Sequence, residues 1–127
     1  MSNLKVLLVD DEEEFVSALA ERLDIRGIET RVAIDGEQAL EIVETEIFDV
    51  VVLDVIMPGI SGLEVLQRLN EKKTASAVIL LTGHGSTKEG LEGMRMGAFD
   101  YLMKPLDIDE LIAKMKEAAS AKRTKQE

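Results

Sequence analysis

Residues 49–62 have the sequence DVVVLDVIMPGISG, the clearest structural signal in the chain. The first half is a run of β-branched and aliphatic residues, typical of a strand buried on both faces in a parallel sheet. The run ends at Asp54, and the Pro-Gly pair at 58–59 then favours a turn. The sequence SGLE at 61–64 predicts a capped helix start. We therefore expect Asp54 at the carboxyl end of a buried strand, where open α/β sheets bind ligands. The alternative is that Asp54 only caps the loop.

The alternation of apolar strand and amphipathic helix continues along the whole chain. Other apolar runs predict strands at 4–9, 28–34, 77–81 and 98–103. Between these runs, apolar residues recur at helical spacing, as Phe15, Leu19 and Leu23 do. This pattern predicts an α/β fold with a parallel sheet and right-handed crossovers. We expect one domain over residues 1–119. The charged segment 120–127 is interpreted as a frayed helix end, a tail or the start of a linker.

The composition of the chain excludes several classes of function. A chain of 127 residues is long enough for one domain with a substantial core. The formal net charge of −10 argues against direct nucleic-acid binding, because phosphates are repelled, and it is compatible with a divalent cation. No cysteine is present, so thiol chemistry is excluded. No apolar run reaches membrane-spanning length, and the first residues lack a signal-peptide core, so we expect a cytoplasmic protein without membrane contact.

Polar residues follow four of the predicted strands: Asp10 with Asp11, then Asp54, Thr82 and Lys104. The carboxyl ends of parallel strands lie at one edge of a sheet, so these side chains should meet there. Three carboxylates in one place repel one another, and a hard cation such as Mg²⁺ relieves that repulsion. With an added ammonium and hydroxyl, the set predicts a cradle for a phosphoryl group. Taken singly, these residues have ordinary structural explanations, such as helix capping.

Glutamates at 12–14 follow this first acidic pair. Acidic residues in the first turn of a helix interact favourably with the helix dipole. We therefore interpret most of this run as structural.

This combination resembles the receiver domain of two-component response regulators, the CheY-like family, from Leu4 to about Ala119. The matching residues are Asp10-Asp11, Asp54, Met57-Pro58-Gly59 with Gly62, Thr82, and Lys104-Pro105. The resemblance implies a flavodoxin-like, doubly wound sheet of five parallel strands in the order 2-1-3-4-5, flanked by five helices.

The resemblance also implies roles for the acidic residues. Asp54 would be the phosphoacceptor. Asp11 and Asp54 would bind Mg²⁺ directly, with Mn²⁺ as an alternative ion. The backbone carbonyl of Ile56 would be a further ligand, and Asp10 would hold a metal-bound water.

Further roles fall on the fourth and fifth strands. Thr82 would hydrogen-bond the acyl phosphate, and Lys104 would pair with it. The Lys104-Pro105 peptide would be cis, an isomer accessible mainly before proline. Tyr101 would act with Thr82 as the switch, although a half-buried tyrosine is also common without such a role. His84, the sole histidine, is expected at the mouth of the site and not as a catalytic base.

The implied function is a phospho-accepting signalling switch that assists its own phosphorylation and dephosphorylation and is not a conventional enzyme. Its partners would be a sensor histidine kinase or phosphotransfer protein, an unidentified output domain or target, and a second copy of the chain when phosphorylated. The face that would change comprises helix 87–96, the last strand and the helix from Ile108. One alternative is a phosphorylation-independent interaction module of the same fold. An aspartyl-phosphate phosphatase would need an acid at Ile56, and a flavodoxin-like cofactor binder would need a phosphate-binding loop where Asp10 and Asp11 stand.

Overall fold

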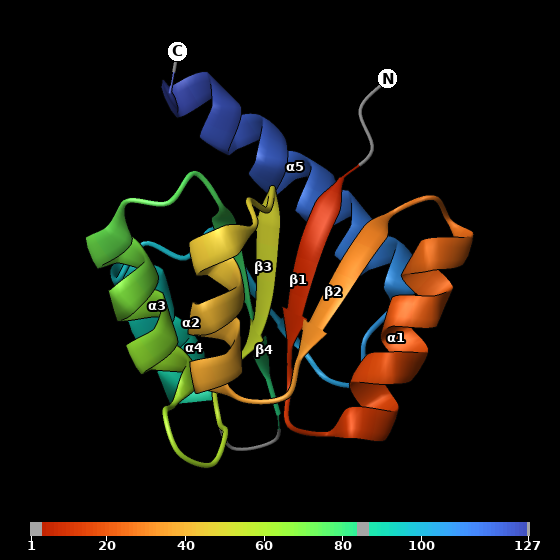
Figure 1. Ribbon diagram of the computed structural model, residues 1–127, viewed down its shortest axis with the longest axis horizontal. Helices are drawn as coiled ribbons and strands as arrows, with labels where there is room; N and C mark the ends of the chain where they lie inside the picture. Colours follow the sequence, from red (N-terminus) through yellow and green to blue (C-terminus); the bar gives the residue numbers. More distant parts are fainter. Residues whose placement is uncertain (1–3, 84–86, 127) are drawn as a thin grey trace.

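The computed structural model describes residues 4–83 and 87–126, in which strands and helices alternate strictly (Figure 1). The strands are β1 (Lys5–Val9), β2 (Glu29–Ala33), β3 (Val50–Asp54), β4 (Ala77–Thr82) and β5 (Asp100–Met103). The helices are α1 (Glu13–Ile25), α2 (Gly36–Thr45), α3 (Gly62–Lys72), α4 (Thr87–Arg95) and α5 (Ile108–Gln126).

The strands form one parallel sheet in the order β2-β1-β3-β4-β5. This is the predicted doubly wound, flavodoxin-like arrangement, so the fold prediction is confirmed. The register places Val9 beside Leu53, and Asp54 beside Leu81. Strands β1, β3 and β4 therefore end at nearly the same level, and the residues that follow them share one edge of the sheet.

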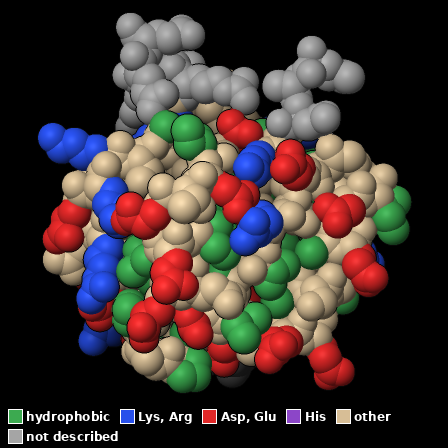
Figure 2. All heavy atoms as spheres, in the orientation of Figure 1, with side chains coloured by type: hydrophobic (Ala, Val, Ile, Leu, Met, Phe, Trp, Pro, Cys, Tyr) green, Lys and Arg blue, Asp and Glu red, His purple; other side chains and the backbone are tan. Residues whose placement is uncertain are grey.

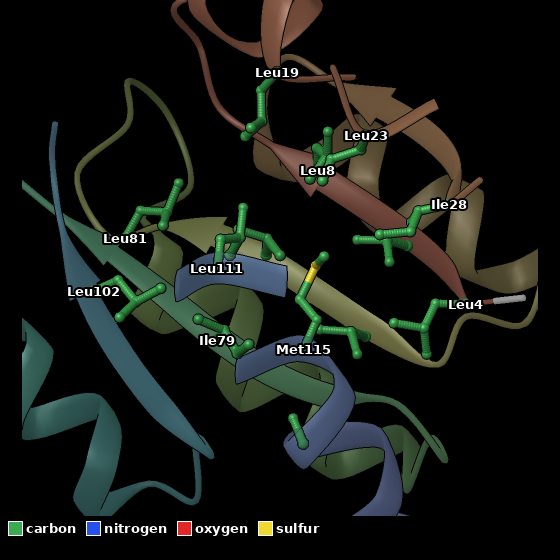
Figure 3. Close-up of a cluster of buried hydrophobic side chains, with 14 of the residues drawn as sticks. Leu4, Leu8, Leu19, Leu23, Ile28, Ile79, Leu81, Leu102, Leu111 and Met115 are labelled. Atoms are coloured by element: carbon green, nitrogen blue, oxygen red, sulfur yellow. The ribbon is translucent and has the colours of Figure 1, made fainter. Parts of the chain in front are cut away.

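Helices cover both faces of the sheet, with α1 and α5 on one side and α2, α3 and α4 on the other (Figure 1). Successive strand residues point to opposite faces, so each strand contributes to two cores. On the α1 and α5 side, Leu8 and Ile79 pack with Leu111 and Met115 (Figure 3). On the other side, the core consists mainly of Leu7, Val9, Val51, Leu53, Leu80, Val65, Leu66 and Leu69.

Two helices begin at side-chain caps, and the cap at Ser61 confirms the prediction for residues 61–64. The Ser61 hydroxyl accepts a hydrogen bond from the Glu64 N–H at 3.2 Å, at the start of α3. The Asp107 carboxylate accepts from both N–H groups at 109–110, at 2.9 and 3.2 Å, at the start of α5. Both side chains satisfy N–H groups that the first helical turn leaves without a backbone partner.

Helix α5 continues through the charged segment as far as Gln126. Ala118 and Ala119 are still buried against the sheet, and the residues after them are mostly good helix formers. No helix within the described residues combines the length and apolar character needed to cross a bilayer. Acidic side chains are spread among Lys and Arg over the surface in Figure 2, in keeping with the net charge of −10.

Candidate phosphoryl-acceptor site

Four of the predicted site residues meet at the carboxyl edge of the sheet. Asp10 directly follows β1, Asp54 ends β3, Thr82 ends β4 and Lys104 directly follows β5. Asp10, Asp54 and Thr82 are buried. The topology thus collects acids, a hydroxyl and an ammonium from distant parts of the chain.

The Lys104 ammonium lies at the centre of this group. Its Nζ atom is 2.8 Å from Asp10 Oδ2, 2.7 Å from Glu12 Oε1 and 3.4 Å from Asp54 Oδ2. The same atom lies 4.6 Å from the centre of the Phe15 ring, which is a cation–π distance. Burial lowers the pKa of Lys104, but its pairing with the three carboxylates outweighs burial and holds the pKa above its ordinary value. The lysine therefore carries a permanent positive charge.

The backbone fixes this lysine. The Lys104 N–H donates to the Thr82 carbonyl at 2.8 Å, which extends the pairing of β5 with β4 by one residue. The Lys104-Pro105 peptide bond is cis.

The Asp54 carboxylate is held from both sides. Its Oδ1 atom accepts a hydrogen bond from the Ile56 N–H at 3.1 Å, while Oδ2 faces Lys104. Burial raises the pKa of Asp54 to about 6, and the nearby Asp10 adds to this rise; the Ile56 N–H and Lys104 act in the opposite direction. At neutral pH the group is mostly ionised and its charge is only partly compensated, which is a chemically reactive state for a carboxylate.

Helix α3 is pressed against the end of β3 at Gly62. The Gly62 N–H donates to the Val55 carbonyl at 3.1 Å. A β-carbon at this position would lie 2.2 Å from the Asp54 carbonyl oxygen and 2.7 Å from the Val55 α-carbon. Only glycine allows this close approach, which fixes the backbone of the acidic strand end.

Asp10, Glu12 and Asp54 form a group of carboxylates that suits a cation. One oxygen from each lies within 4.8 Å of the others. Three negative charges face one ammonium, so the group keeps an excess of negative charge that a hard divalent ion would neutralise. Asp11 does not belong to this group: its side chain is exposed and lines a shallow cavity beside Pro58.

No site role was predicted for Glu12 from the sequence. The residue sits just before α1 in an extended conformation, and its N–H donates to Asp10 Oδ1 at 2.9 Å. No pattern in the sequence separates Glu12 from the glutamates at 13–14, so its place beside Asp10 could not be predicted.

Thr82 lies between the acidic site and helix α4. Its hydroxyl donates to the Leu102 carbonyl at 3.4 Å, a long hydrogen bond across β4 and β5. A β-carbon at Gly90 would lie 2.9 Å from the Thr82 methyl and 3.2 Å from Tyr101 Cδ2. Thr82 and the half-buried Tyr101 thus converge on one point of α4. His84 lies outside the described residues.

An α/β sheet with this strand order, and with acids and a lysine at its carboxyl edge, defines a receiver-type signalling protein. Residues 6–116 match the response regulator receiver domain family, and the chain belongs to that family.

Similar proteins agree with this assignment. The chain is 37% identical over 122 residues to the uncharacterized transcriptional regulatory protein YkoG of Bacillus subtilis, covering 96% of this chain and 54% of that protein. It is 42% identical over 112 residues to the transcriptional regulatory protein CpxR of Escherichia coli, covering 88% of this chain and 47% of that protein. A receiver domain protein from Clostridium thermocellum superimposes with a TM-score of 0.90 at 33% identity, over 95% of this chain and 98% of that one. The chain thus spans about half the length of the curated relatives.

Proposed function

We propose that this receiver domain accepts a phosphoryl group on Asp54 from a phosphohistidine of a sensor kinase or phosphotransfer protein. An Asp54 carboxylate oxygen attacks phosphorus and forms an O–P bond, while the P–N bond to the histidine breaks. The electron pair of that bond returns to the imidazole. The observation that carries this proposal is the setting of Asp54: a buried strand-end carboxylate, fixed by the Ile56 N–H and facing the Lys104 ammonium at 3.4 Å.

Mg²⁺, or Mn²⁺, is the proposed cofactor. Asp11 and Asp54 would bind the ion directly, with the Ile56 carbonyl, while Asp10 would hold a metal-bound water. When bound, the ion supplies positive charge that offsets the negative charge of the carboxylates and phosphoryl oxygens. The excess negative charge of Asp10, Glu12 and Asp54 around Lys104 supports a cation at this edge of the sheet, whereas the role of Asp11 rests on the resemblance. Glu12 belongs to the same carboxylate group as Asp10 and Asp54, so it is a further candidate for metal binding.

The acyl phosphate would pair with Lys104 and accept a hydrogen bond from the Thr82 hydroxyl. A phosphoryl oxygen is a stronger acceptor than the Leu102 carbonyl that this hydroxyl now meets at 3.4 Å. Thr82 would then move away from α4, and the Tyr101 ring would fill the space that it leaves. The resulting change in the face made by α4, β5 and α5 would alter binding to an output domain, a target protein or a second copy. The site residues would also assist loss of the phosphoryl group.

Intact-protein mass spectrometry tests the acceptor. With Mg²⁺ and acetyl phosphate, the wild-type chain should gain the mass of one phosphoryl group. Asp54→Asn should gain none, because an amide oxygen is too weak a nucleophile. Asp109→Asn, an exposed aspartate of α5, is the matched control and should label like the wild type. Equal labelling of Asp54→Asn would refute the assignment.

A further inference from the structure

The Lys104 ammonium lies closer to Glu12 and Asp10 than to the proposed acceptor Asp54. Its Nζ atom is 2.7 Å from Glu12 and 2.8 Å from Asp10, but 3.4 Å from Asp54. The contact with Asp54 is the longest of these three ion pairs. The ammonium is thus already bound strongly by groups other than the proposed acceptor.

Two of the groups around the ammonium come from the start of α1. Glu12 directly precedes the helix and Phe15 lies in its first turn, and both side chains lie beside the Lys104 Nζ atom. The Phe15 ring is half-buried and packs on the core beneath α1 and α5. This packing fixes the ring, whose centre lies 4.6 Å from the Lys104 Nζ atom. The Glu12 side chain is 63% exposed, yet its carboxylate turns back to Lys104. Its hydrogen bond to Lys104 holds the pKa of Glu12 below the ordinary value.

We propose that Glu12 and Phe15 form a resting-state holding site for the Lys104 ammonium, which competes with the phosphoryl group on Asp54 for this lysine. The proposal rests on the function proposed above. One ammonium cannot make its best contacts with both sites, so pairing with the phosphoryl group loosens its contacts with the holding site. Glu12 and Phe15 are therefore positioning residues that weaken the phosphorylated state relative to the resting state.

The coupling is reciprocal, because any group that binds the resting lysine better must oppose its transfer by the same factor. Removing the holding site should thus favour the phosphorylated state. If Glu12 instead acted mainly as a metal ligand, its removal would weaken the phosphorylated state, which depends on the ion. The two roles predict effects of opposite sign.

The first experiment examines the resting, metal-free protein by NMR of the lysine ammonium groups. Glu12→Gln should shift the Lys104 ¹H–¹⁵N signal and speed its hydrogen exchange with water. Glu13→Gln is the matched control, since it removes the same charge from the next residue, an exposed glutamate that makes no ion pair with Lys104. An unchanged Lys104 signal in Glu12→Gln would overturn the holding site, whether or not Asp54 is phosphorylated.

The second experiment titrates beryllium fluoride, a phosphoryl mimic, into the protein at saturating Mg²⁺ and follows backbone amide shifts. Glu12→Gln should bind the mimic about threefold more tightly than the wild type, as expected for loss of one solvent-exposed ion pair. Phe15→Leu keeps an apolar side chain on the core but removes the ring face that meets the ammonium. This variant should also bind beryllium fluoride more tightly than the wild type. Glu13→Gln should match the wild type.

Weaker or unchanged binding in Glu12→Gln would overturn the competition. A wild-type protein that fails to bind the mimic would instead count against the proposed function of Asp54. The ammonium spectra would still decide the holding site in that case.

Discussion

Replacing Asp54 by asparagine should stabilise the metal-free protein at neutral pH. Burial raises the pKa of Asp54 to about 6 in the folded state, whereas its ordinary value is 3.8. Above pH 6 the carboxylate is ionised in both the folded and the unfolded state, and its burial then opposes folding. The difference between these pKa values corresponds to about 3 kcal/mol, an upper limit for the gain from Asp54→Asn.

The size of this effect depends on pH, while its sign stays the same. Below about pH 4 the carboxyl group is protonated in both states, so the wild type carries no such penalty. The penalty develops between about pH 4 and pH 6, as the unfolded state releases the proton first. The advantage of Asp54→Asn should therefore be near zero at pH 4 and largest above pH 6.

Urea unfolding of the two proteins at pH 4, 5, 6 and 7, in the presence of a chelator, measures this profile. Glu41→Gln is the control for removal of one surface charge from α2, and it should change stability much less. Saturating Mg²⁺ should stabilise the wild type more than Asp54→Asn by linkage, so the difference in unfolding free energy between the two proteins should become smaller. A gain of equal size at pH 4 and pH 7, or a less stable Asp54→Asn at pH 7, would show that burial of the charge is not the cause.

Three further substitutions test the surroundings of Asp54. Lys104→Ala should destabilise the metal-free protein by roughly 3 kcal/mol because buried Asp10 and Asp54 lose their cation. In thermal melts, Mg²⁺ should restore much of this lost stability. The changes in amide chemical shift on phosphorylation should stay smaller in Lys104→Ala than in the wild type. Thr82→Ala should still accept phosphate but leave the Tyr101 ring unmoved, and crystal structures with and without beryllium fluoride would contradict this if the ring moved as in the wild type. Gly62→Ala should cost about 3 kcal/mol in chemical unfolding because its β-carbon would meet backbone at 2.2 Å, while Gly83→Ala, with nothing within 4 Å, should be close to neutral.

Much of the architecture could be predicted because the signals are local. Buried strands appear as apolar runs, and parallel strands must end at one edge, so Asp10, Asp54, Thr82 and Lys104 could be grouped without coordinates. The caps at Ser61 and 107–110 were equally accessible, because each involves residues close in sequence.

Other features depend on contacts between distant segments. Lys104 pairs with Glu12 across 92 positions of sequence, and no local pattern separates this glutamate from the two that follow it. The role of Gly90 beside Thr82 and Tyr101 depends on how closely α4 approaches the sheet. The end of α5 was left open among three interpretations, since apolar periodicity fades after Ala119 while helix propensity does not.

The close approach of α3 at Gly62 ties the first turn of this helix to the end of β3. The amide of Gly62 and the carbonyl of Val55 bind backbone to backbone, so the first turn of α3 and the end of β3 must move as one unit. A shift of Asp54 would have to carry α3 with it against the core formed by Val65 and Leu66. Phosphoryl arrival should therefore leave hydrogen exchange at Gly62 almost unchanged, and the structural response should fall on Thr82 and the segments beyond it.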